Sequence, residues 1–177
     1  MSGTTMTTNK VRFSYVHVFA PHANAEGQEP KYSVSILIDK KDTGTLQRLN
    51  AAIEAAKLAG KDKWGGKIPT NLKLPLHDGD VDRPDDPAYR GCYYCSCSSK
   101  RKPGVVDRNL NPILDSDEVY SGCYGRAALN LFAFSAAGNK GIGVGLNHLQ
   151  KLEDGERLGG QGISVEAAFG DSDSLFD

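Results

Sequence analysis

The chain has 177 residues, of which 39% are hydrophobic and 24% are charged, and its formal net charge is −1. This composition is typical of one globular domain with its own core, and it excludes a chain that is disordered throughout. No apolar run approaches the roughly 20 residues that span a bilayer, and the opening residues MSGTTMTTNK lack the pattern of a signal peptide. We therefore expect a cytoplasmic protein without a membrane segment.

The first half of the chain predicts two strands. Residues 11–20, VRFSYVHVFA, are rich in β-branched and aromatic residues and stop at Pro21. Residues 31–39, KYSVSILID, place Tyr32, Val34, Ile36 and Ile38 on one face, which is the alternation of a strand. A loop of turn-forming residues separates the two segments, so we expect them to pair in a hairpin.

A helix follows the second strand. Asp42, Thr43 or Thr45 can accept a hydrogen bond from a free backbone N–H at its start, and Gly60 can end it. Apolar residues recur between them at helical spacing, in a narrow stripe. The pattern predicts one principal helix packed on a sheet.

The second half of the chain predicts further strands after an irregular segment. Residues 64–87 are rich in Gly, Pro and Asp, without the DxDxDG pattern of a calcium loop, and we expect a solvated loop. Strands return at residues 88–102, 120–134 and 141–152. Short strands separated by turns, with one helix among them, favour a small β-barrel.

The segment GCYYCSCSSKRK, residues 91–102, holds three of the four cysteines. A zinc module would use Cys92, Cys95, Cys97 and Cys123, and a CxxC pair on a tight turn could begin such a site. Positions three apart on an extended strand face opposite sides, however, so Cys92 would point away from its neighbours. The strand interpretation makes the cysteines packing residues, and the zinc module is the alternative.

Two of the predicted strands combine tyrosine with basic residues on one face. Bases stack on aromatic rings and cations neutralise phosphates, which suits an unpaired nucleic acid. Tyrosines half-buried at a barrel rim, beside solvated charges, would give the same pattern. The candidate stacking residues are Tyr94, Tyr124 and the loop residue Trp64, and the candidate phosphate contacts are Lys100, Arg101, Lys102 and Arg126, followed by Arg90 and Lys31.

No catalytic pattern stands out. The glycine-rich run 141–145, GIGVG, lacks the following helix that a dinucleotide site needs, and it favours a glycine-containing strand. The GxSxG elbow is missing, and no carboxylate spacing singles out any histidine. We expect a protein that is not an enzyme and needs no cofactor.

The end of the chain differs in charge from the rest. All four acidic residues after Arg157 lie in a segment without Lys or Arg, which leaves 21 basic and 18 acidic side chains in residues 1–157. We expect a flexible start at residues 1–9, a domain at 10–157, and a disordered acidic tail at 158–177. The tail could dock on a partner or compete with DNA for the protein's own groove, through Asp171, Asp173, Leu175, Phe176 and Asp177.

Two segments and the tail resemble a bacteriophage family of single-stranded DNA-binding proteins. The segments are KYSVSILIDKKD at 31–42 and GNKGIGVGLNHLQKLEDGERLGG at 138–160, and the likeness extends over most of residues 10–177. The family is related to the replication single-strand binders of lytic phages. The resemblance implies an OB-like five-stranded barrel, single-stranded DNA in its groove, and action in the infected bacterial cell.

The resemblance also implies that the tail recruits replication or recombination proteins. Tails of the related proteins usually end on Phe, whereas Phe176 is followed by Asp177, so docking that needs a terminal Phe carboxylate is not implied here. A phage adaptor that uses the same barrel to bind protein instead of DNA is a further alternative.

Overall fold

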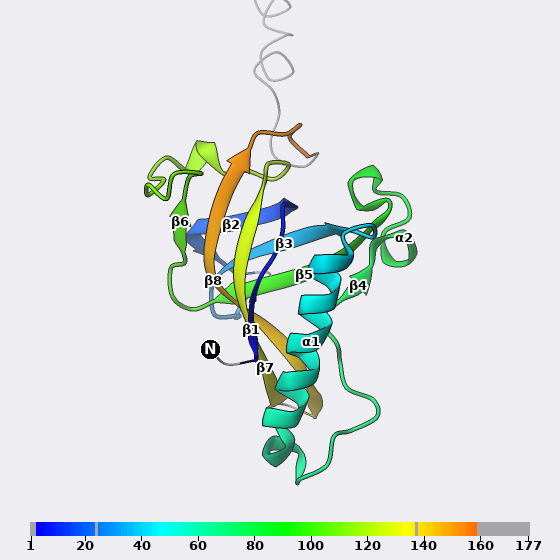
Figure 1. Cartoon of the computed structure of the whole chain (residues 1–177). Coiled ribbons are helices and arrows are strands. Elements are labelled where there is room, and N and C mark those ends of the chain that lie inside the picture. The colour runs from blue at the N-terminus through cyan, green and yellow to red at the C-terminus, as the bar shows by residue number, and fades with distance from the viewer. Residues whose placement is uncertain (1–2, 24, 137, 159–177) are drawn as a thin grey trace, which may run out of the picture.

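The structure is a computed structural model that describes residues 3–23, 25–136 and 138–158 (Figure 1). Its eight strands are β1 Thr5–Thr7, β2 Val11–His22, β3 Lys31–Asp39, β4 His77–Asp78, β5 Cys92–Ser99, β6 Gly104–Val106, β7 Tyr124–Ala136 and β8 Asn139–Glu153. Its helices are α1 Thr43–Ala59 and the short α2 Gly79–Asp82, with 3-10 turns η1 Lys61–Trp64, η2 Pro87–Tyr89 and η3 Ser116–Glu118. Within these ranges, no helix has the length and apolar character needed to cross a membrane.

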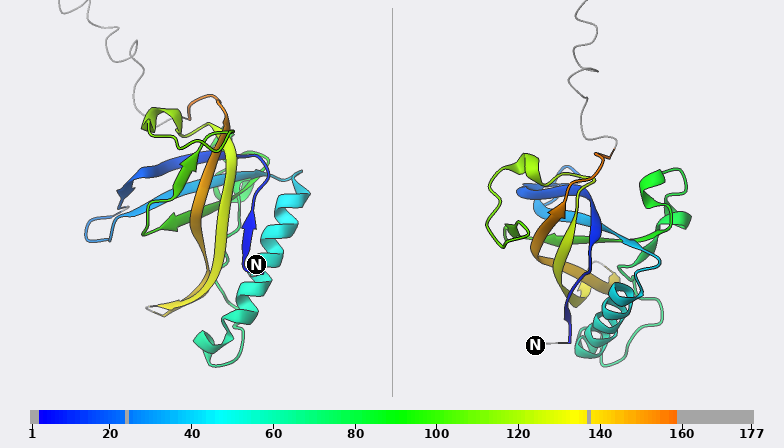
Figure 2. Two further views of the ribbon diagram at one scale, coloured as in Figure 1. Left: turned by 60° about the vertical axis from the view of Figure 1, so that its left-hand side comes forward. Right: turned by 45° about the horizontal axis from the view of Figure 1, so that its top comes forward.

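The strands close into a ring. β2 pairs with β3, β3 with β5, β5 with β8, β8 with β7, and β7 returns to β2, which makes a ring of 5 strands. Only the β5–β8 pairing in this ring is parallel. The β7–β8 hairpin runs across the layer formed by β2, β3 and β5 (Figure 2). This arrangement confirms the prediction of a mainly β, OB-like fold with one principal helix.

The helix α1 begins and ends where the sequence indicates. The Asp42 carboxylate accepts a hydrogen bond from the Thr45 backbone N–H at 3.1 Å, and Gly60 donates its own N–H to Ala56. A Cβ on Gly60 would lie 2.1 Å from the Cβ of Ala133, so only glycine lets the helix end so close to β7. The buried stripe of α1 packs beside β1 and β7, as Figure 1 shows.

The cysteines of β5 are core residues. Cys95 and Cys97 are fully buried, and they lie opposite Ile36 and Val34 of β3. A hydrogen bond with Cys95, together with burial, raises the pKa of the Cys97 thiol, so this thiol stays protonated. Among the described residues, no group of three or more His, Cys, Asp or Glu side chains could hold a metal ion. The zinc alternative finds no support in this arrangement.

The observed strand boundaries differ from the expected ones at several ends. The strand expected at 88–102 is shorter, because residues 87–89 form η2 and Gly91 has a φ of 70° that interrupts extended backbone. β2 continues past Pro21 to His22, where proline is tolerated because this end of the strand pairs only with β3.

Candidate nucleic-acid interface

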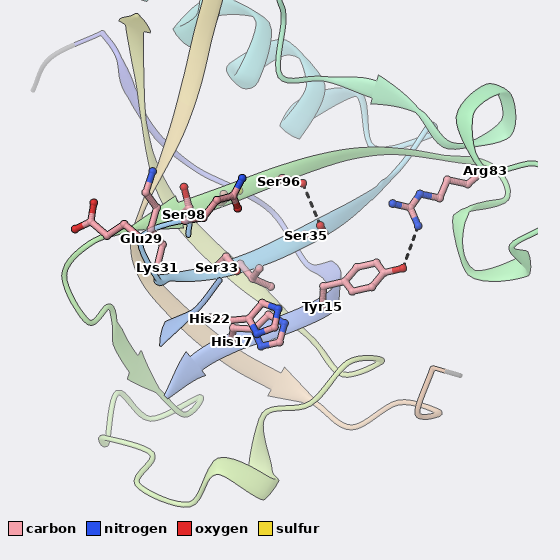
Figure 3. A pocket seen from close by; sticks show the side chains of 13 residues that line it. Tyr15, His17, His22, Glu29, Lys31, Ser33, Ser35, Arg83, Ser96 and Ser98 are labelled. Carbon is pink, nitrogen blue, oxygen red and sulfur yellow. Dashed lines mark hydrogen bonds between the residues drawn. The ribbon is translucent and has the colours of Figure 1, made fainter. Parts of the chain in front are cut away.

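A groove of about 820 Å³ crosses β2, β3 and β5 (Figure 3). Its walls and floor combine aromatic, basic and small polar side chains. They come from β2 (Tyr15, His17, His22), from the β2–β3 loop (Gln28, Glu29), from β3 (Lys31, Ser33, Val34, Ser35), from the segment after α2 (Arg83) and from β5 (Ser96, Cys97, Ser98).

Serines form the floor of the groove. Ser33 lies opposite Ser98 and Ser35 opposite Ser96 in the β3–β5 pairing, and the hydroxyl oxygens of Ser35 and Ser96 are 3.2 Å apart. A serine hydroxyl can both donate and accept a hydrogen bond. Because serine side chains are short and polar, an extended chain molecule can lie close to the sheet and form hydrogen bonds with it.

Tyr15 reaches the groove because β2 is irregular there. Strict alternation would place it beside Phe13 in the core, but the register of β2 against β3 shifts between Ser14 and His17. Tyr15 adopts a φ of 49° and its side chain is 47% exposed. Left-handed backbone is rare for a bulky residue and costs about 1–2 kcal/mol, so contacts around Tyr15 must stabilise this conformation.

Arg83 is the residue that holds it. Its Nη1 donates a hydrogen bond to the Tyr15 hydroxyl at 3.0 Å (Figure 3), and this bond raises the pKa of Arg83. The guanidinium lies 5.5 Å from the ring centre of Tyr15, 5.0 Å from that of Tyr89 and 5.7 Å from that of Tyr94. Cations are attracted to aromatic faces at such distances. Arg83 thus links the groove to the tyrosines beyond it.

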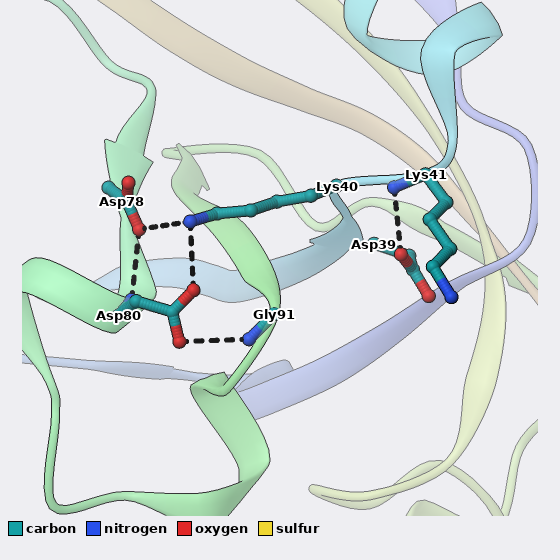
Figure 4. Close-up of polar contacts among 6 residues, drawn as sticks. All are labelled: Asp39, Lys40, Lys41, Asp78, Asp80 and Gly91. Atoms are coloured by element: carbon teal, nitrogen blue, oxygen red, sulfur yellow. Dashed lines mark hydrogen bonds and ion pairs between the residues drawn. The ribbon is translucent and has the colours of Figure 1, made fainter.

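An ion-pair cluster fixes the segment that carries Arg83. Lys40 Nζ lies 2.8 Å from Asp78 Oδ1 and 2.8 Å from Asp80 Oδ2, and Asp80 also accepts the Gly91 backbone N–H at 3.0 Å (Figure 4). Hydrogen bonds to the two carboxylates raise the pKa of Lys40, while its ammonium lowers the pKa of both aspartates. Asp78 and Asp80 remain accessible to solvent, as expected of a solvated loop, and in addition they pair with Lys40 at the end of β3.

Two histidines line the groove as a stacked pair. The ring centres of His17 and His22 are 4.1 Å apart and their planes differ by 7°. Burial and the neighbouring His22 lower the pKa of His17, so its ring is neutral at neutral pH. Figure 3 shows both rings beside the serine floor.

Several predicted phosphate contacts lie in or near the groove. Lys31 lines it, and Lys100, Arg101 and Lys102 follow directly after β5 as exposed residues. Lys100 Nζ is 3.5 Å from a carboxylate oxygen of Glu29, which is itself a groove residue. These four cations therefore remain candidate phosphate contacts.

Tyr94 borders the groove, although it does not line it. Its hydroxyl donates a hydrogen bond to Asp82 Oδ2 at 2.9 Å, and its ring lies near Arg83. Tyr124 and Arg126 lie elsewhere on the barrel: Tyr124 packs near Arg12, whose guanidinium is 5.4 Å from the ring centre, and Arg126 donates to the Thr8 carbonyl at 2.9 Å. The sequence-predicted set is thus not brought together at one place.

Trp64 does not have the position expected of a base-stacking residue. It is only 7% exposed, and its indole N–H donates to the Phe134 carbonyl at 3.1 Å. Its ring is part of the hydrophobic core, so the expectation of an exposed loop residue that stacks on a base is wrong for Trp64. Arg90 is exposed just after η2, outside the groove. The predicted tail residues fall outside the described part of the chain.

The sequence interpretation missed Tyr15, Arg83, the two groove histidines and the serine floor. The serines were visible as the polar half of the alternation in 31–39 and 92–99. Tyr15 and the two histidines could have been noted as rings with polar atoms in or just after the first predicted strand. No pattern pointed to Arg83, which lies in irregular chain.

Five strands close into an OB-like ring, and the groove beside it is lined by aromatic, hydroxyl and cationic side chains. This combination is typical of proteins that bind single-stranded nucleic acids. Residues 4–176 match the family described as Enterobacter phage Enc34, ssDNA-binding protein. The chain belongs to this family.

Relatives and solved structures agree with that assignment. Protein p50 of Acyrthosiphon pisum secondary endosymbiont phage 1 is 32% identical over 174 residues, covering 92% of this chain and 91% of the relative. The single-stranded DNA-binding protein of bacteriophage Enc34, solved in complex with ssDNA, is 27% identical with a TM-score of 0.76, covering 88% of this chain and 90% of that one. The single-stranded DNA-binding protein gp2.5 of bacteriophage T7 shares the fold at 17% identity and a TM-score of 0.61, over 94% and 93% of the two chains.

Proposed function

We propose that this protein binds single-stranded phage DNA with little sequence preference, and that the groove over β2, β3 and β5 is the binding site. The observation that carries the proposal is the Tyr15–Arg83 pair in this groove, an aromatic ring whose hydroxyl accepts a hydrogen bond from the guanidinium at 3.0 Å. The solved complex of the Enc34 relative with ssDNA supports the same ligand.

Each part of the groove has a role in such binding. The ring of Tyr15 and the stacked histidine pair offer faces to unpaired bases, and every base has a face to stack, so the contact tolerates any sequence. Arg83 and Lys31 neutralise phosphates, with Lys100, Arg101 and Lys102 at the end of β5. A duplex keeps its bases paired and stacked and cannot use the aromatic faces.

The remaining predicted residues are candidates for a longer path. Tyr94 and Arg90 lie beyond Arg83, while Tyr124 and Arg126 lie on β7. DNA that continues from the groove around the barrel would have these residues as further aromatic and cationic contacts.

The acidic tail would regulate access to the groove or recruit replication and recombination proteins. Deleting residues 170–177 should tighten DNA binding at low salt, because an anion that competes with phosphate is removed. Unchanged binding would leave partner docking as the role of the tail.

Fluorescence anisotropy with a labelled oligo-dT, over a salt series and against a duplex of equal length, tests the function. We expect binding that prefers the single strand and weakens as salt rises. Absence of binding at low salt would refute the proposal and favour the adaptor alternative. Stoichiometric zinc in freshly purified protein would instead favour the zinc module.

A further inference from the structure

A second hollow adjoins the groove on the other side of Ser96. It has a volume of about 380 Å³ and lies between the segment 73–77 and residues 142–144 of β8. Ser96 lines both the groove and this hollow. A single strand of DNA that crosses the serine floor at Ser96 can therefore enter the second hollow without leaving the protein surface.

The wall formed by the segment 73–77 is fixed to β8. Lys73 donates its backbone N–H to the Lys140 carbonyl at 2.9 Å and accepts the Ile142 N–H at 2.9 Å. A Cβ on Gly141 would lie 2.4 Å from the Lys73 carbonyl oxygen, so glycine is needed for this close approach. The hollow is consequently preformed, and its formation explains one glycine of the GIGVG run.

The lining suits the flat face of a base. Leu74, Pro75 and Ile142 give apolar walls, and Leu74 is 44% exposed although it is a large aliphatic residue. His77 adds a ring that packs on Tyr94, with 5.1 Å between ring centres and 30° between planes. Lys73 places a cation at the same hollow, where a phosphate that accompanies the base can be neutralised.

We propose that this hollow, termed the apolar subsite, binds the base of a nucleotide next to those held in the groove. The DNA then runs from β2 across β3 and β5 to β8. The proposal rests on the proposed function, since it assigns a further contact to the same ligand. Stacking of a base on an aromatic ring contributes about 1–3 kcal/mol, and His77 is the one ring among the described residues that line this hollow, so we expect the lower end of that range, about fivefold in affinity.

An introduced tryptophan tests the contact directly. The variant Leu74→Trp places an indole at the apolar subsite, and the matched control Leu58→Trp places one on α1, where Leu58 is 61% exposed and lines neither hollow. Both are titrated with oligo-dT while tryptophan emission and the anisotropy of a labelled oligonucleotide are recorded. We expect emission of Leu74→Trp to be quenched in step with binding, and that of Leu58→Trp to stay constant.

The outcomes separate this inference from the proposed function. Binding by anisotropy without quenching of Leu74→Trp overturns the apolar subsite and leaves the groove intact. Absence of binding overturns both. As a second measurement, Leu74→Asp should bind oligo-dT about fivefold more weakly than Leu58→Asp, because a base contact is lost and a carboxylate is added. Equal affinities of these two variants would also overturn the subsite.

Discussion

Replacing Tyr15 should separate DNA binding from stability, because its ring and its backbone have different roles. The ring is 47% exposed in the groove, and the backbone has a φ of 49°. If one base stacks on this ring, Tyr15→Ala removes about 1–3 kcal/mol of binding energy. At 1.4 kcal/mol per tenfold change, the Kd should rise about 5- to 150-fold.

The backbone predicts a different order for stability. Left-handed φ costs about 1–2 kcal/mol for a residue with a Cβ, and glycine avoids this penalty. Glycine loses about 0.5–1 kcal/mol relative to alanine through the greater freedom of the unfolded chain. The free energy of unfolding of Tyr15→Gly should therefore be roughly 0.5–1 kcal/mol higher than that of Tyr15→Ala. Both variants lack the ring, so both should bind DNA weakly.

Anisotropy with labelled oligo-dT measures the affinities, and urea denaturation measures the free energies of unfolding. Tyr15→Phe keeps the ring but loses the hydroxyl that Arg83 contacts, so its Kd should lie between those of the wild type and Tyr15→Ala. Wild-type affinity of Tyr15→Ala would refute the stacking role. If Tyr15→Gly were less stable than Tyr15→Ala, the strain assigned to this position would be refuted instead.

Three further variants test other parts of the site. Lys31→Ala should lower the slope of log Kd against log salt by about 0.7, the share of one single-strand phosphate, whereas Lys61→Ala in η1 should leave it unchanged. Burial, and secondarily the neighbouring His22, lowers the pKa of His17, so this ring gains its positive charge only below about pH 6.5. DNA binding should therefore tighten as pH falls below that value, and His17→Gln should reduce this effect. The free energy of unfolding should fall over the same range, since the unfolded chain binds that proton more readily. Lys40→Gln should speed amide hydrogen exchange at Gly91, because the carboxylate that accepts this N–H loses its cation partner. An unchanged slope, a pH-independent affinity or unaltered exchange would contradict the respective role.

Alternation and capping predicted the regular parts of the fold. Alternation in β3 placed Val34 and Ile36 on one face, which is buried, and the strand interpretation of β5 made Cys95 and Cys97 packing residues, which lie opposite them. The first of the three candidate caps, Asp42, and the predicted stop at Gly60 are the residues that bound α1. These features depend on local backbone geometry, which a short sequence window contains.

The groove was harder to predict because it depends on a departure from regular geometry. The shift in register between Ser14 and His17 moves Tyr15 from the core face to the outer face, and no local pattern in VRFSYVHVFA marks it. Trp64 shows the opposite error. A tryptophan in an irregular segment suggested an exposed ring, but its N–H finds a partner at Phe134 and the ring is buried.

These contacts form one connected support for the proposed stacking ring. Lys40 fixes Asp78 and Asp80, the segment that follows carries Arg83, and Arg83 holds the hydroxyl of Tyr15. A ring that is already held outward loses little conformational freedom when a base stacks on it, so more of the stacking energy appears as affinity. On the proposed function, the strain at Tyr15 would serve binding, because the folded chain bears its cost before DNA arrives. We therefore expect the acidic residues near position 80 to support DNA binding indirectly, although their charge has the same sign as the phosphates.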